Sequence, residues 1–438
     1  MLAASEFAVR RARFLNAMGR GVAVFASTPV HLRNNDVEHE YRQDSDLYYL
    51  TGFDEPESVL VLSTEHAQHK VVLFVRPRNP ERETWDGPRA GVEGAVARFG
   101  ADAAFPIAEL ASKLPEYLQD CPRLYYRLGR DRRFDARILD ALDAVRGKAR
   151  TGVLPPREIV DPGTIVHEMR LRKSAAEIET MLRAAEITAK AHARAMEIAA
   201  PGRYEYEVEA ELLRTFRAHG AERPAYGSIV GSGPNATILH HRRNDRRMEQ
   251  GELLLIDAGA EYAYYACDVT RTFPVGGRFS PEQRAIYDVV LAAQAAAIAA
   301  VRPGTTLNEV HQKALEVLVD GLVTLGLIEG PVASAMQEER YKPYYMHRTS
   351  HWLGMDVHDV GDYFVSKQAR ELEPGFVLTV EPGLYIAPGS PCDPIWHGIG
   401  VRIEDDVLVT NDGPQVLTAA IPKRAEELEQ LLAARAST

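Results

Sequence analysis

The segment EQGELLLIDAG at residues 249–259 matches EPGFVLTVEPG at residues 373–383, an offset of 124 residues. In both segments a polar turn leads into an apolar strand that ends on a carboxylate closely followed by glycine. Two duplicated helix–loop–strand units are therefore predicted, and their repetition would bring the terminal carboxylates, Asp257 and Glu381, to one central site. A second match at an offset of 102 residues supports the repeat, with Glu-Val following after four residues in both copies: Pro201-Gly202 and Pro303-Gly304.

Turn-forming residues divide the chain into an N-terminal part of alternating strands and helices and a larger C-terminal part. Apolar runs at residues 59–62 and 71–75 predict buried strands, and residues 92–99 predict a helix. Helix and strand breakers at residues 151–156 and again at 161–163 indicate a boundary between domains. The prediction is an α/β (α+β) protein with two domains, residues 1–165 and 166–438.

Composition and charge narrow the class of protein. The 438 residues include 51 Lys+Arg and 62 Asp+Glu, a formal charge of −11, which disfavours nucleic acid or an anionic membrane as the main partner. No apolar run approaches the roughly 20 residues that span a bilayer, and the first residues mix charges where a signal peptide would be apolar. The 3 cysteines have no CxxC spacing, so neither a disulfide framework nor a thiolate zinc site is indicated. We expect a soluble cytoplasmic protein.

A hairpin predicted over residues 253–273 carries two aspartates. Ten residues separate Asp257 from Asp268, so a symmetric turn near Tyr262-Ala263 would place the two directly opposite each other, with Cβ atoms about 4.5–5.5 Å apart. Two facing carboxylates in an apolar environment require a proton or a cation. The pair alone leaves two interpretations open, a metal site or two exposed carboxylates on an edge hairpin.

The C-terminal half contributes two further carboxylates. Glu381 ends an apolar run, and Glu404 shares one face of an alternating strand with Arg402. Taken alone, Glu404 could also be a surface residue paired with that arginine. Four carboxylates carry a charge of about −4, more than one divalent ion neutralises, and therefore indicate two ions.

Three histidines lie between the two acidic strands, at His347, His351 and His358. The first two are four residues apart, but Arg348 stands where the HExxH zinc motif requires Glu, so that motif is rejected. One histidine added to two Asp and two Glu gives a mostly oxygen ligand set. Such a set favours manganese or magnesium, while the imidazole also admits cobalt or zinc.

Six further stretches of the sequence are distinctive: YRQDSDLYYLTG at 41–52, IDAG at 256–259, DVTRTF at 268–273, SHWLG at 350–354, VEPG at 380–383 and RIED at 402–405. Together they resemble the pita-bread metallopeptidases of family M24, and within it the aminopeptidase P (Xaa-Pro aminopeptidase) group. The resemblance covers nearly the whole chain and implies an N-terminal mixed α/β domain, a C-terminal pita-bread domain with a pseudo-two-fold repeat, and metal-dependent hydrolysis. One departure is Arg348, where relatives usually carry glycine.

The resemblance also implies a dinuclear site with five protein ligands. Of these, Asp257 would bind one manganese ion, while His351 and Glu381 would bind the other. The two remaining ligands, Asp268 and Glu404, would bridge the ions. A hydroxide activated by the two ions would then hydrolyse the N-terminal Xaa-Pro bond of a peptide.

Further residues acquire roles by the same resemblance. His240 and His358 would bind substrate, stabilise developing charge or shuttle a proton, and Glu381 would exchange protons with the attacking water and the leaving nitrogen. The residues alone leave open that His240 is a loop histidine and His358 a core histidine. Arg402 is expected to act in catalysis by orienting the ligands, together with Tyr385. The expected substrate-binding residues are His240, His347, His358, Tyr226 and Tyr385.

Three alternatives and one partner accompany this assignment. A prolidase restricted to Xaa-Pro dipeptides would use the same chemistry, a pita-bread protein without activity would act as a binding module, and creatinase-like hydrolysis would need no metal. The glycines of the loop GSGPN at residues 231–235 suggest a phosphate-binding loop, but the loop lacks the Gly-Lys-Ser/Thr of a P-loop, so phosphate binding is disfavoured. By resemblance the protein forms a homo-oligomer, a tetramer or dimer, in which Trp85 either reaches a neighbouring subunit's site or is simply a packed residue.

Overall fold

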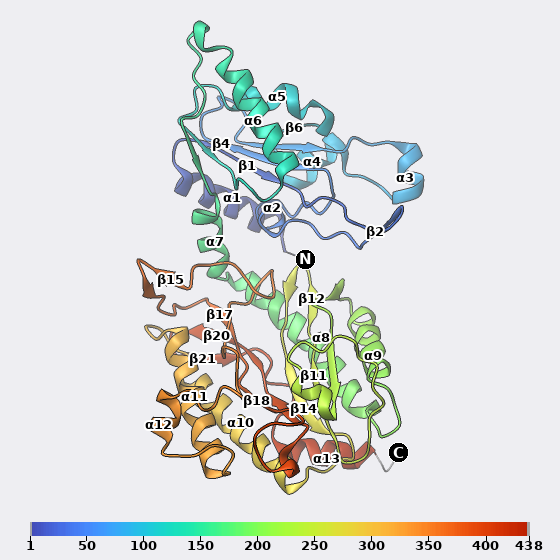
Figure 1. Cartoon of the computed structure of the whole chain (residues 1–438). Coiled ribbons are helices and arrows are strands. Elements are labelled where there is room, and N and C mark those ends of the chain that lie inside the picture. Colours follow the sequence, from blue (N-terminus) through green and yellow to red (C-terminus); the bar gives the residue numbers. More distant parts are fainter. Residues whose placement is uncertain (1, 436–438) are drawn as a thin grey trace. The chain divides into compact units, whose positions relative to one another are not determined.

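The computed structural model describes residues 2–435, and its chain divides into two compact units, Met1–Arg170 and Leu171–Thr438 (Figure 1). The division falls within helix α7 (Gly163–Leu171), as does the boundary predicted between residues 165 and 166. Among residues 2–435, no helix combines the length and apolar composition needed to cross a membrane.

The N-terminal unit is built on a six-stranded mixed sheet of order β6-β5-β4-β1-β7-β8. The two strands predicted at residues 59–62 and 71–75 are confirmed as β4 and β5, and every residue of both is buried. Strands β1, β4 and β5 pair antiparallel, while β6, β7 and β8 join parallel to their neighbours. The strands are β1 (Val22–Ala26), β4 (Val59–Ser63), β5 (Val71–Val75), β6 (Ala103–Pro106), β7 (Arg123–Tyr125) and β8 (Glu158–Val160); β2 (Leu32–Asn34) and β3 (Val37–Glu38) form a separate hairpin.

Helices cover this sheet, and the helix predicted at residues 92–99 is α4. Apolar residues of α5 and α6 pack with strand residues in one core cluster. Arg170 of α7 donates to Asp46 of α2 over 2.7 Å, and both side chains are buried. The helices are α1 (Ala4–Met18), α2 (Ser45–Thr51), α3 (Pro80–Asp86), α4 (Gly91–Phe99), α5 (Leu110–Tyr117) and α6 (Arg132–Arg146).

The C-terminal unit repeats one order of elements, which confirms the predicted duplication. Each half begins with a helix pair, α8 (Ala175–Ile198) with α9 (Glu205–Ala218) and then α10 (Pro281–Ala300) with α11 (Leu307–Thr324). The second helix of each pair starts with a capping box that uses Glu207 or Glu309, the two glutamates of the sequence repeat. The bridges Tyr204–Arg247 and Thr306–Glu371 also occupy equivalent positions.

After its helix pair, each half forms an antiparallel three-stranded sheet, of order β10-β11-β14 in the first and β17-β20-β21 in the second. The helices and the first sheet share a large buried core. The second sheet packs with residues of α10 and α11 in a smaller cluster. The strands are β9 (Arg223–Pro224), β10 (Ile229–Ser232), β11 (Leu253–Asp257), β12 (Ala260–Tyr262), β13 (Tyr265–Ala266), β14 (Thr270–Pro274), β15 (Phe364–Val365), β16 (Gln368–Ala369), β17 (Val377–Val380), β18 (Gly383–Ile386), β19 (Ile399–Arg402), β20 (Asp405–Thr410) and β21 (Gly413–Val416), with helices α12 (Val332–Gln337) and α13 (Ala425–Arg435).

The hairpin register differs from the one predicted. Tyr262 pairs with Tyr265, and Asp257 pairs with Thr270, so Asp257 and Asp268 are not directly opposite. The two-residue turn is Ala263-Tyr264, one residue later than expected, with φ of 49° and 69°. Positive φ at both positions is typical of a type I′ hairpin turn. Asp268 is therefore a diagonal neighbour of Asp257 on the same face of the hairpin.

The chain approaches itself closely between the two aspartates. A Cβ atom at Gly259 would lie 1.7 Å from the carbonyl oxygen of Cys267, so no larger residue fits there. The glycine of the Asp-Ala-Gly sequence thus permits the close approach of the two hairpin strands that brings Asp268 back beside Asp257.

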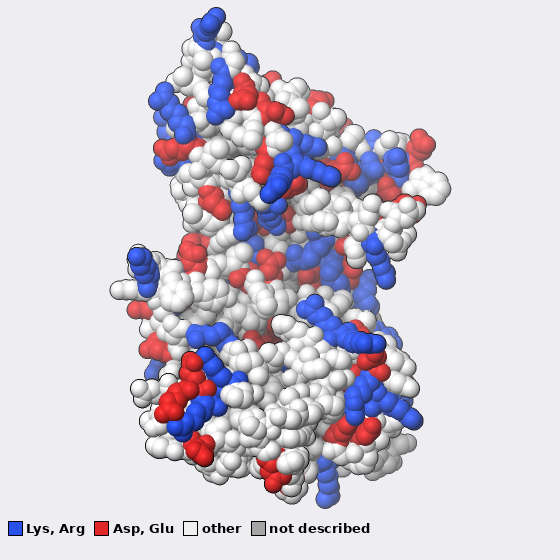
Figure 2. All heavy atoms as spheres, viewed as in Figure 1, with Lys and Arg blue, Asp and Glu red and all other residues white. Residues whose placement is uncertain are grey.

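Charged side chains of both signs are interspersed over each unit on the face shown in Figure 2. On this face the basic side chains are not gathered into one stripe, in keeping with the acidic net charge of the protein.

Candidate metal centre

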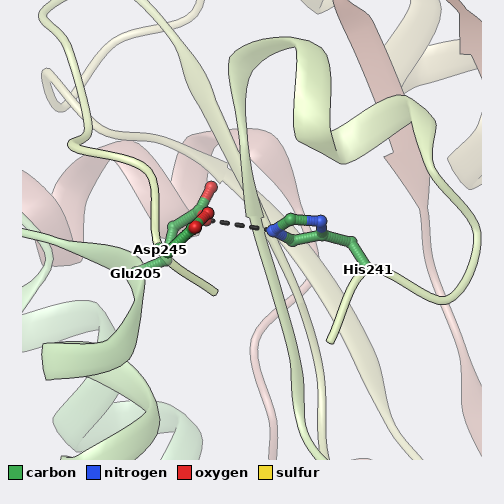
Figure 3. A group of neighbouring side chains, drawn as sticks. All are labelled: Glu205, His241 and Asp245. Carbon is green, nitrogen blue, oxygen red and sulfur yellow. Dashed lines mark hydrogen bonds and ion pairs between the residues drawn. The ribbon is translucent and has the colours of Figure 1, made fainter. Parts of the chain in front are cut away.

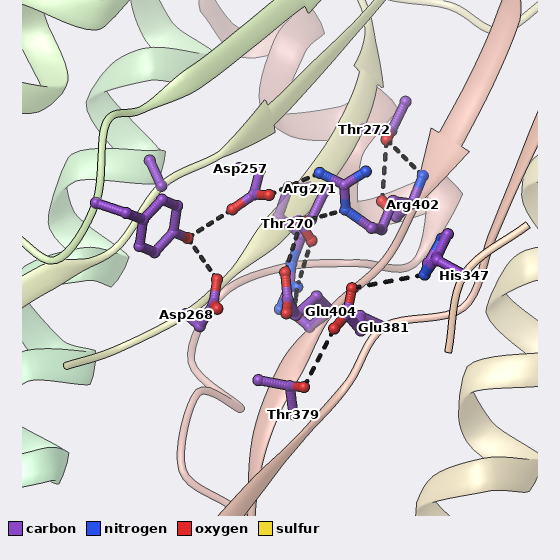
Figure 4. A network of polar contacts seen from close by, with 12 residues as sticks. Asp257, Asp268, Thr270, Arg271, Thr272, His347, Thr379, Glu381, Arg402 and Glu404 are labelled. Atoms are coloured by element: carbon purple, nitrogen blue, oxygen red, sulfur yellow. Dashed lines mark hydrogen bonds and ion pairs between the residues drawn. The ribbon is translucent and has the colours of Figure 1, made fainter. Parts of the chain in front are cut away.

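Four carboxylates, called here the central carboxylates, converge where the two halves of the C-terminal unit meet (Figure 4). Each half supplies one at the end of a strand and one just before the returning strand. The halves are joined there by Thr272, which accepts from the N–H of Arg402 and donates to its carbonyl over 3.0 Å. The central carboxylates are Asp257, Asp268, Glu381 and Glu404.

His351 reaches this cluster because its segment runs beside β17. The N–H of Thr379 donates to the carbonyl of His351, and Trp352 forms a bridge with Leu378. Nδ1 of His351 lies 2.9 Å from the carbonyl of Trp352, which leaves Nε2 facing the cluster. That nitrogen is 3.5 Å from both Asp268 and Glu381. A backbone bond at Nδ1 is the usual way to aim an imidazole at a metal ion.

Few protons are available to the central carboxylates. The single hydroxyl of Tyr226 lies 2.5 Å from Oδ1 of Asp257 and 2.5 Å from Oδ1 of Asp268. One hydroxyl proton satisfies only one of these two contacts, so the other oxygen pair needs a further proton or a cation. Hydroxyls of Thr270 and Thr379 donate to Glu404 and Glu381 over 2.6 and 3.3 Å.

The donor set fits divalent metal ions. Burial raises the pKa of Glu404 well above its usual value and raises the pKa of Glu381 to about 7, with neighbouring carboxylates adding to both shifts. Carboxylates that resist ionisation in this way are stabilised by an adjacent cation. Nε2 of His351 and carboxylate oxygens of Asp268 and Glu404 lie within 4.8 Å of one another, close enough to share one ion. Oxygen donors with one imidazole suit manganese, cobalt or zinc.

Arg402 links the cluster to a chain of hydrogen bonds. Its guanidinium donates to Asp257 over 2.6 Å, to Thr270 over 3.0 Å and to the hydroxyl of Tyr385 over 3.0 Å. The Tyr385 hydroxyl in turn lies 2.9 Å from Nε2 of His347. Burial lowers the pKa of His347 to about 4, so its imidazole is neutral near pH 7 and accepts from Tyr385. Arg402, Tyr385 and His347 thus orient one another and Asp257.

A cavity of about 1180 Å³ opens onto the central carboxylates. It is lined by every residue predicted for the site except Tyr385, which lies behind it and is 1% exposed. His240 and His358 are exposed on its wall, and the ring of His358 packs edge-on against His351 at 4.4 Å between centroids. The segment containing His347 and His351 is irregular, consistent with rejection of a helical HExxH motif.

A second carboxylate–histidine group lies outside this cavity, and its three ligand atoms are also close enough to share an ion (Figure 3). Its glutamate is already saturated with hydrogen bonds, because Glu205 accepts from the backbone of Ser232 and Arg246 at 2.7 and 3.0 Å and from three side chains. These side chains are Ser232, Asn235 and His241. With its lone pairs used in this way, Glu205 ties down the loop that carries His240. The group consists of Glu205, His241 and Asp245.

Comparison with known proteins assigns the family. A sequence profile of metallopeptidase family M24 matches residues 179–411, and one of the aminopeptidase P N-terminal domain matches residues 7–125. The chain is 44% identical over 431 residues to the Xaa-Pro aminopeptidase of Escherichia coli, covering 98% of each. It belongs to the M24 metallopeptidase family. This M24 chain is therefore a metal-dependent hydrolase with the mixed α/β and pita-bread domains of that family.

Solved structures of aminopeptidases share its fold over the whole chain. An aminopeptidase from Pseudomonas aeruginosa superimposes with a TM-score of 0.98 at 51% identity, covering 100% of this chain and 99% of the other. A zinc-substituted aminopeptidase P from Escherichia coli in complex with product superimposes with a TM-score of 0.96 at 44% identity, covering 99% of each.

The sequence did not single out several residues that hold the centre of this M24 protein. Thr270, Thr272 and Thr379 donate to or link its ligand strands. The signal for the first two is the polar run Thr270-Arg271-Thr272 at the start of β14, a strand that is buried throughout. Glu205 carries no such signal, because its partners come from a distant loop.

Proposed function

We propose that this chain is an Xaa-Pro aminopeptidase that releases the first residue of peptides with proline at the second position. The observation that carries the proposal is the convergence of four carboxylates and one imidazole at the floor of a peptide-sized cavity. It is supported by relatives named Xaa-Pro aminopeptidase that match 97–98% of the chain.

The proposed cofactor is a pair of divalent ions, manganese in preference to cobalt or zinc. The proposed ligands are Asp257, Asp268, His351, Glu381 and Glu404. When bound, the ions supply a water nucleophile at neutral pH and polarise the scissile carbonyl. The proposal rests on the short supply of protons at these carboxylates and on the aim of the His351 Nε2 toward them.

In the proposed mechanism Glu381 moves the proton. Its Oε1 accepts from Thr379, which leaves Oε2 to take a proton from the attacking water and return it to the proline nitrogen as the bond breaks. Arg402 favours the ionised form of Asp257 and holds it in place, and Tyr226 holds Asp257 beside Asp268. This division of tasks leaves the cavity wall to bind the peptide.

The wall residues proposed to bind substrate are His240 and His358, with Tyr226 nearby. Both imidazoles are exposed to the cavity and have no side-chain hydrogen bond to another described residue, so both are available to a peptide carbonyl. His347 and Tyr385 would act through their shared hydrogen bond, which fixes the wall behind the substrate.

The proposal extends to the setting of the enzyme. We place it in the cytoplasm on the basis of its composition and cysteine spacing, and we propose a homo-oligomer, a tetramer or dimer, on the basis of the sequence resemblance. Light scattering of the purified protein tests the oligomer, and a single subunit mass in solution would refute it. Fractionation of cells tests the location.

Cleavage of matched peptides tests the activity and its main alternative. Metal-stripped protein with added manganese is given Xaa-Pro-Xaa and Xaa-Pro. Metal-dependent release of the first residue from the tripeptide is the expected result. Cleavage of the dipeptide alone would make the protein a prolidase, and no cleavage despite bound metal would make it a binding module.

A further inference from the structure

The cavity of about 1180 Å³ differs in charge between its floor and its rim. Its floor holds the central carboxylates and the proposed ions, whereas two of its lining arginines, Arg242 and Arg348, are exposed to solvent. They come from different halves of the unit, Arg242 from the segment before β11 and Arg348 from the segment between α12 and β17.

Arg242 has no neutralising partner in the described part of the chain. Three neighbouring arginines are all engaged: Arg243 with Asp245 at 2.5 Å, Arg246 with Glu252 at 2.5 Å, and Arg247 with the carbonyl of Gly202 at 2.8 Å. Arg242 instead runs past Gly227, where its Cδ would lie 3.7 Å from an added Cβ atom. Its stem therefore follows the cavity wall beside Tyr226 and leaves its guanidinium free.

Arg348 is likewise bonded only to a neutral group among the described residues. Its Nη2 donates to the side-chain oxygen of Asn308, at the start of α11. The charge of Arg348 acts within the cavity. The pKa of His311, which lines the cavity, is lowered to about 4 mainly by burial and secondly by the positive charge of Arg348. An arginine held by an amide keeps its full charge for a ligand.

We propose that Arg242 and Arg348 form a carboxylate-binding rim that recognises the downstream end of the peptide substrate. The proposal rests on the function proposed above, since a peptide cleaved at its N-terminal bond at the floor must extend its remaining residues toward the rim. Each added residue extends a peptide by at most about 3.3–3.6 Å, so a short peptide brings its terminal carboxylate near the cavity mouth. Opposite charges at the floor and the rim orient the peptide with its N-terminus inward.

The carboxylate has two sources, which peptide chemistry separates. One is the C-terminal carboxylate of a short peptide, and the other is an Asp or Glu side chain after the proline. Xaa-Pro-Ala is compared as free acid and as amide to test the first. For the second, Xaa-Pro-Ala-Asp-amide is compared with Xaa-Pro-Ala-Asn-amide.

The measured quantity is the ratio of kcat/KM between the charged and the neutral member of each pair. For the unmodified enzyme we expect at least one ratio of about three- to tenfold, falling as salt is added. The double variant Arg242→Gln/Arg348→Gln is expected to bring that ratio to about one. The single variant Arg348→Lys, which keeps the charge, should retain most of the ratio of the unmodified enzyme. The adjacent control Arg243→Gln should leave that ratio unchanged.

Two outcomes overturn the rim without touching the proposed activity. One is cleavage by the unmodified enzyme with both ratios near one, and the other is a preference that survives in the double variant. If no peptide is cleaved, the proposed function fails and the rim is still tested by calorimetry. In that case the same charged and neutral peptides are titrated into the Glu381→Gln variant with and without the two arginine substitutions. Equal dissociation constants for the charged and neutral peptides would overturn the rim there as well.

Discussion

Two carboxylate–histidine groups of the C-terminal unit satisfy their carboxylates in opposite ways. Glu205 accepts from two backbone N–H groups and three side chains, including His241 at 3.1 Å. The central carboxylates share a few hydroxyls and one guanidinium, and the single Tyr226 hydroxyl lies beside both Asp257 and Asp268 but has a proton for only one of them. Similar residue types therefore form a structural clamp in one place and the proposed metal centre in the other.

The difference teaches that hydrogen-bond supply separates a structural carboxylate from a metal ligand. A carboxylate that already accepts from several N–H groups gains little from an ion, whereas crowded carboxylates without donors need one. Proximity alone does not make the distinction, since ligand atoms lie within 4.8 Å of one another both in the Glu205 group and among Asp268, His351 and Glu404 at the centre.

The largest expected effect is at the centre itself. Asp268→Ala should lose bound metal and lower kcat/KM by about 10³-fold or more, because one proposed bridging ligand is removed. Metal content measured by mass spectrometry, peptide cleavage and circular dichroism check this. The matched control is Asp245→Ala in the Glu205 group, which should keep both metal and activity. Full metal content in Asp268→Ala would show that Asp268 is no more a metal ligand than Asp245 of the Glu205 group.

Metal removal should act on stability in a pH-dependent way. Burial raises the pKa of Glu381 to about 7 in the metal-free protein, above its unfolded value near 4.5. The folded state then binds more protons, so this carboxyl costs stability as pH rises from about 4.5 to about 7, by up to roughly 3 kcal/mol. Bound ions keep the carboxylate ionised and remove that cost.

The stabilisation conferred by manganese should therefore grow between pH 5.5 and 7.5. Urea unfolding of metal-free and metal-loaded protein at several pH values measures it. The Glu381→Gln variant serves as control, because it lacks the Glu381 carboxyl and its manganese stabilisation should grow less over this range. A stabilisation that is the same at every pH would show that the central carboxylates do not respond to the ion as described.

A smaller effect is expected for the clamp. Glu205→Gln keeps the shape of the side chain but presents N–H groups where the clamp needs acceptors. This should lower the free energy of unfolding by about 1–3 kcal/mol and leave the metal content unchanged. Glu209→Gln on the same helix, whose side chain bonds to no described residue, is the control. Loss of metal from Glu205→Gln would mean that the clamp is itself a metal site.

The smallest expected effect tests the hydrogen-bond chain behind the centre. Tyr385→Phe removes the hydroxyl between Arg402 and His347 and should lower kcat by about tenfold, with little change in metal content. The control is Tyr344→Phe, since the Tyr344 hydroxyl bonds the Leu327 carbonyl outside the cavity. Equal rates for the two variants would remove Tyr385 from the supporting chain.

Much of the centre was predictable because its residues end or begin regular strands. The repeat of Asp257 and Glu381 at strand ends follows from apolar runs and glycines, and the structure gives both halves the same order of elements. The predicted hairpin register was wrong, because it placed the two-residue turn one residue too early. Ala263 and Tyr264 both adopt positive φ without glycine or asparagine, so the sequence contains no signal for that turn.

Contacts between distant segments were beyond sequence reasoning. Glu205 looks like an ordinary residue near a helix start, and only folding brings it to the loop of Ser232 and His241. Arg348 was recognised as unusual, but its bond to Asn308 depends on how α11 meets the loop. Patterns along the chain predict which strands carry ligands, whereas tertiary contacts decide how each ligand is held.

Anomalous diffraction from crystals grown with manganese tests the contrast between the two groups most directly. The account predicts two manganese peaks among Asp257, Asp268, His351, Glu381 and Glu404, and none beside Glu205 and His241. A single peak at the centre, or a peak at the Glu205 group, would contradict it.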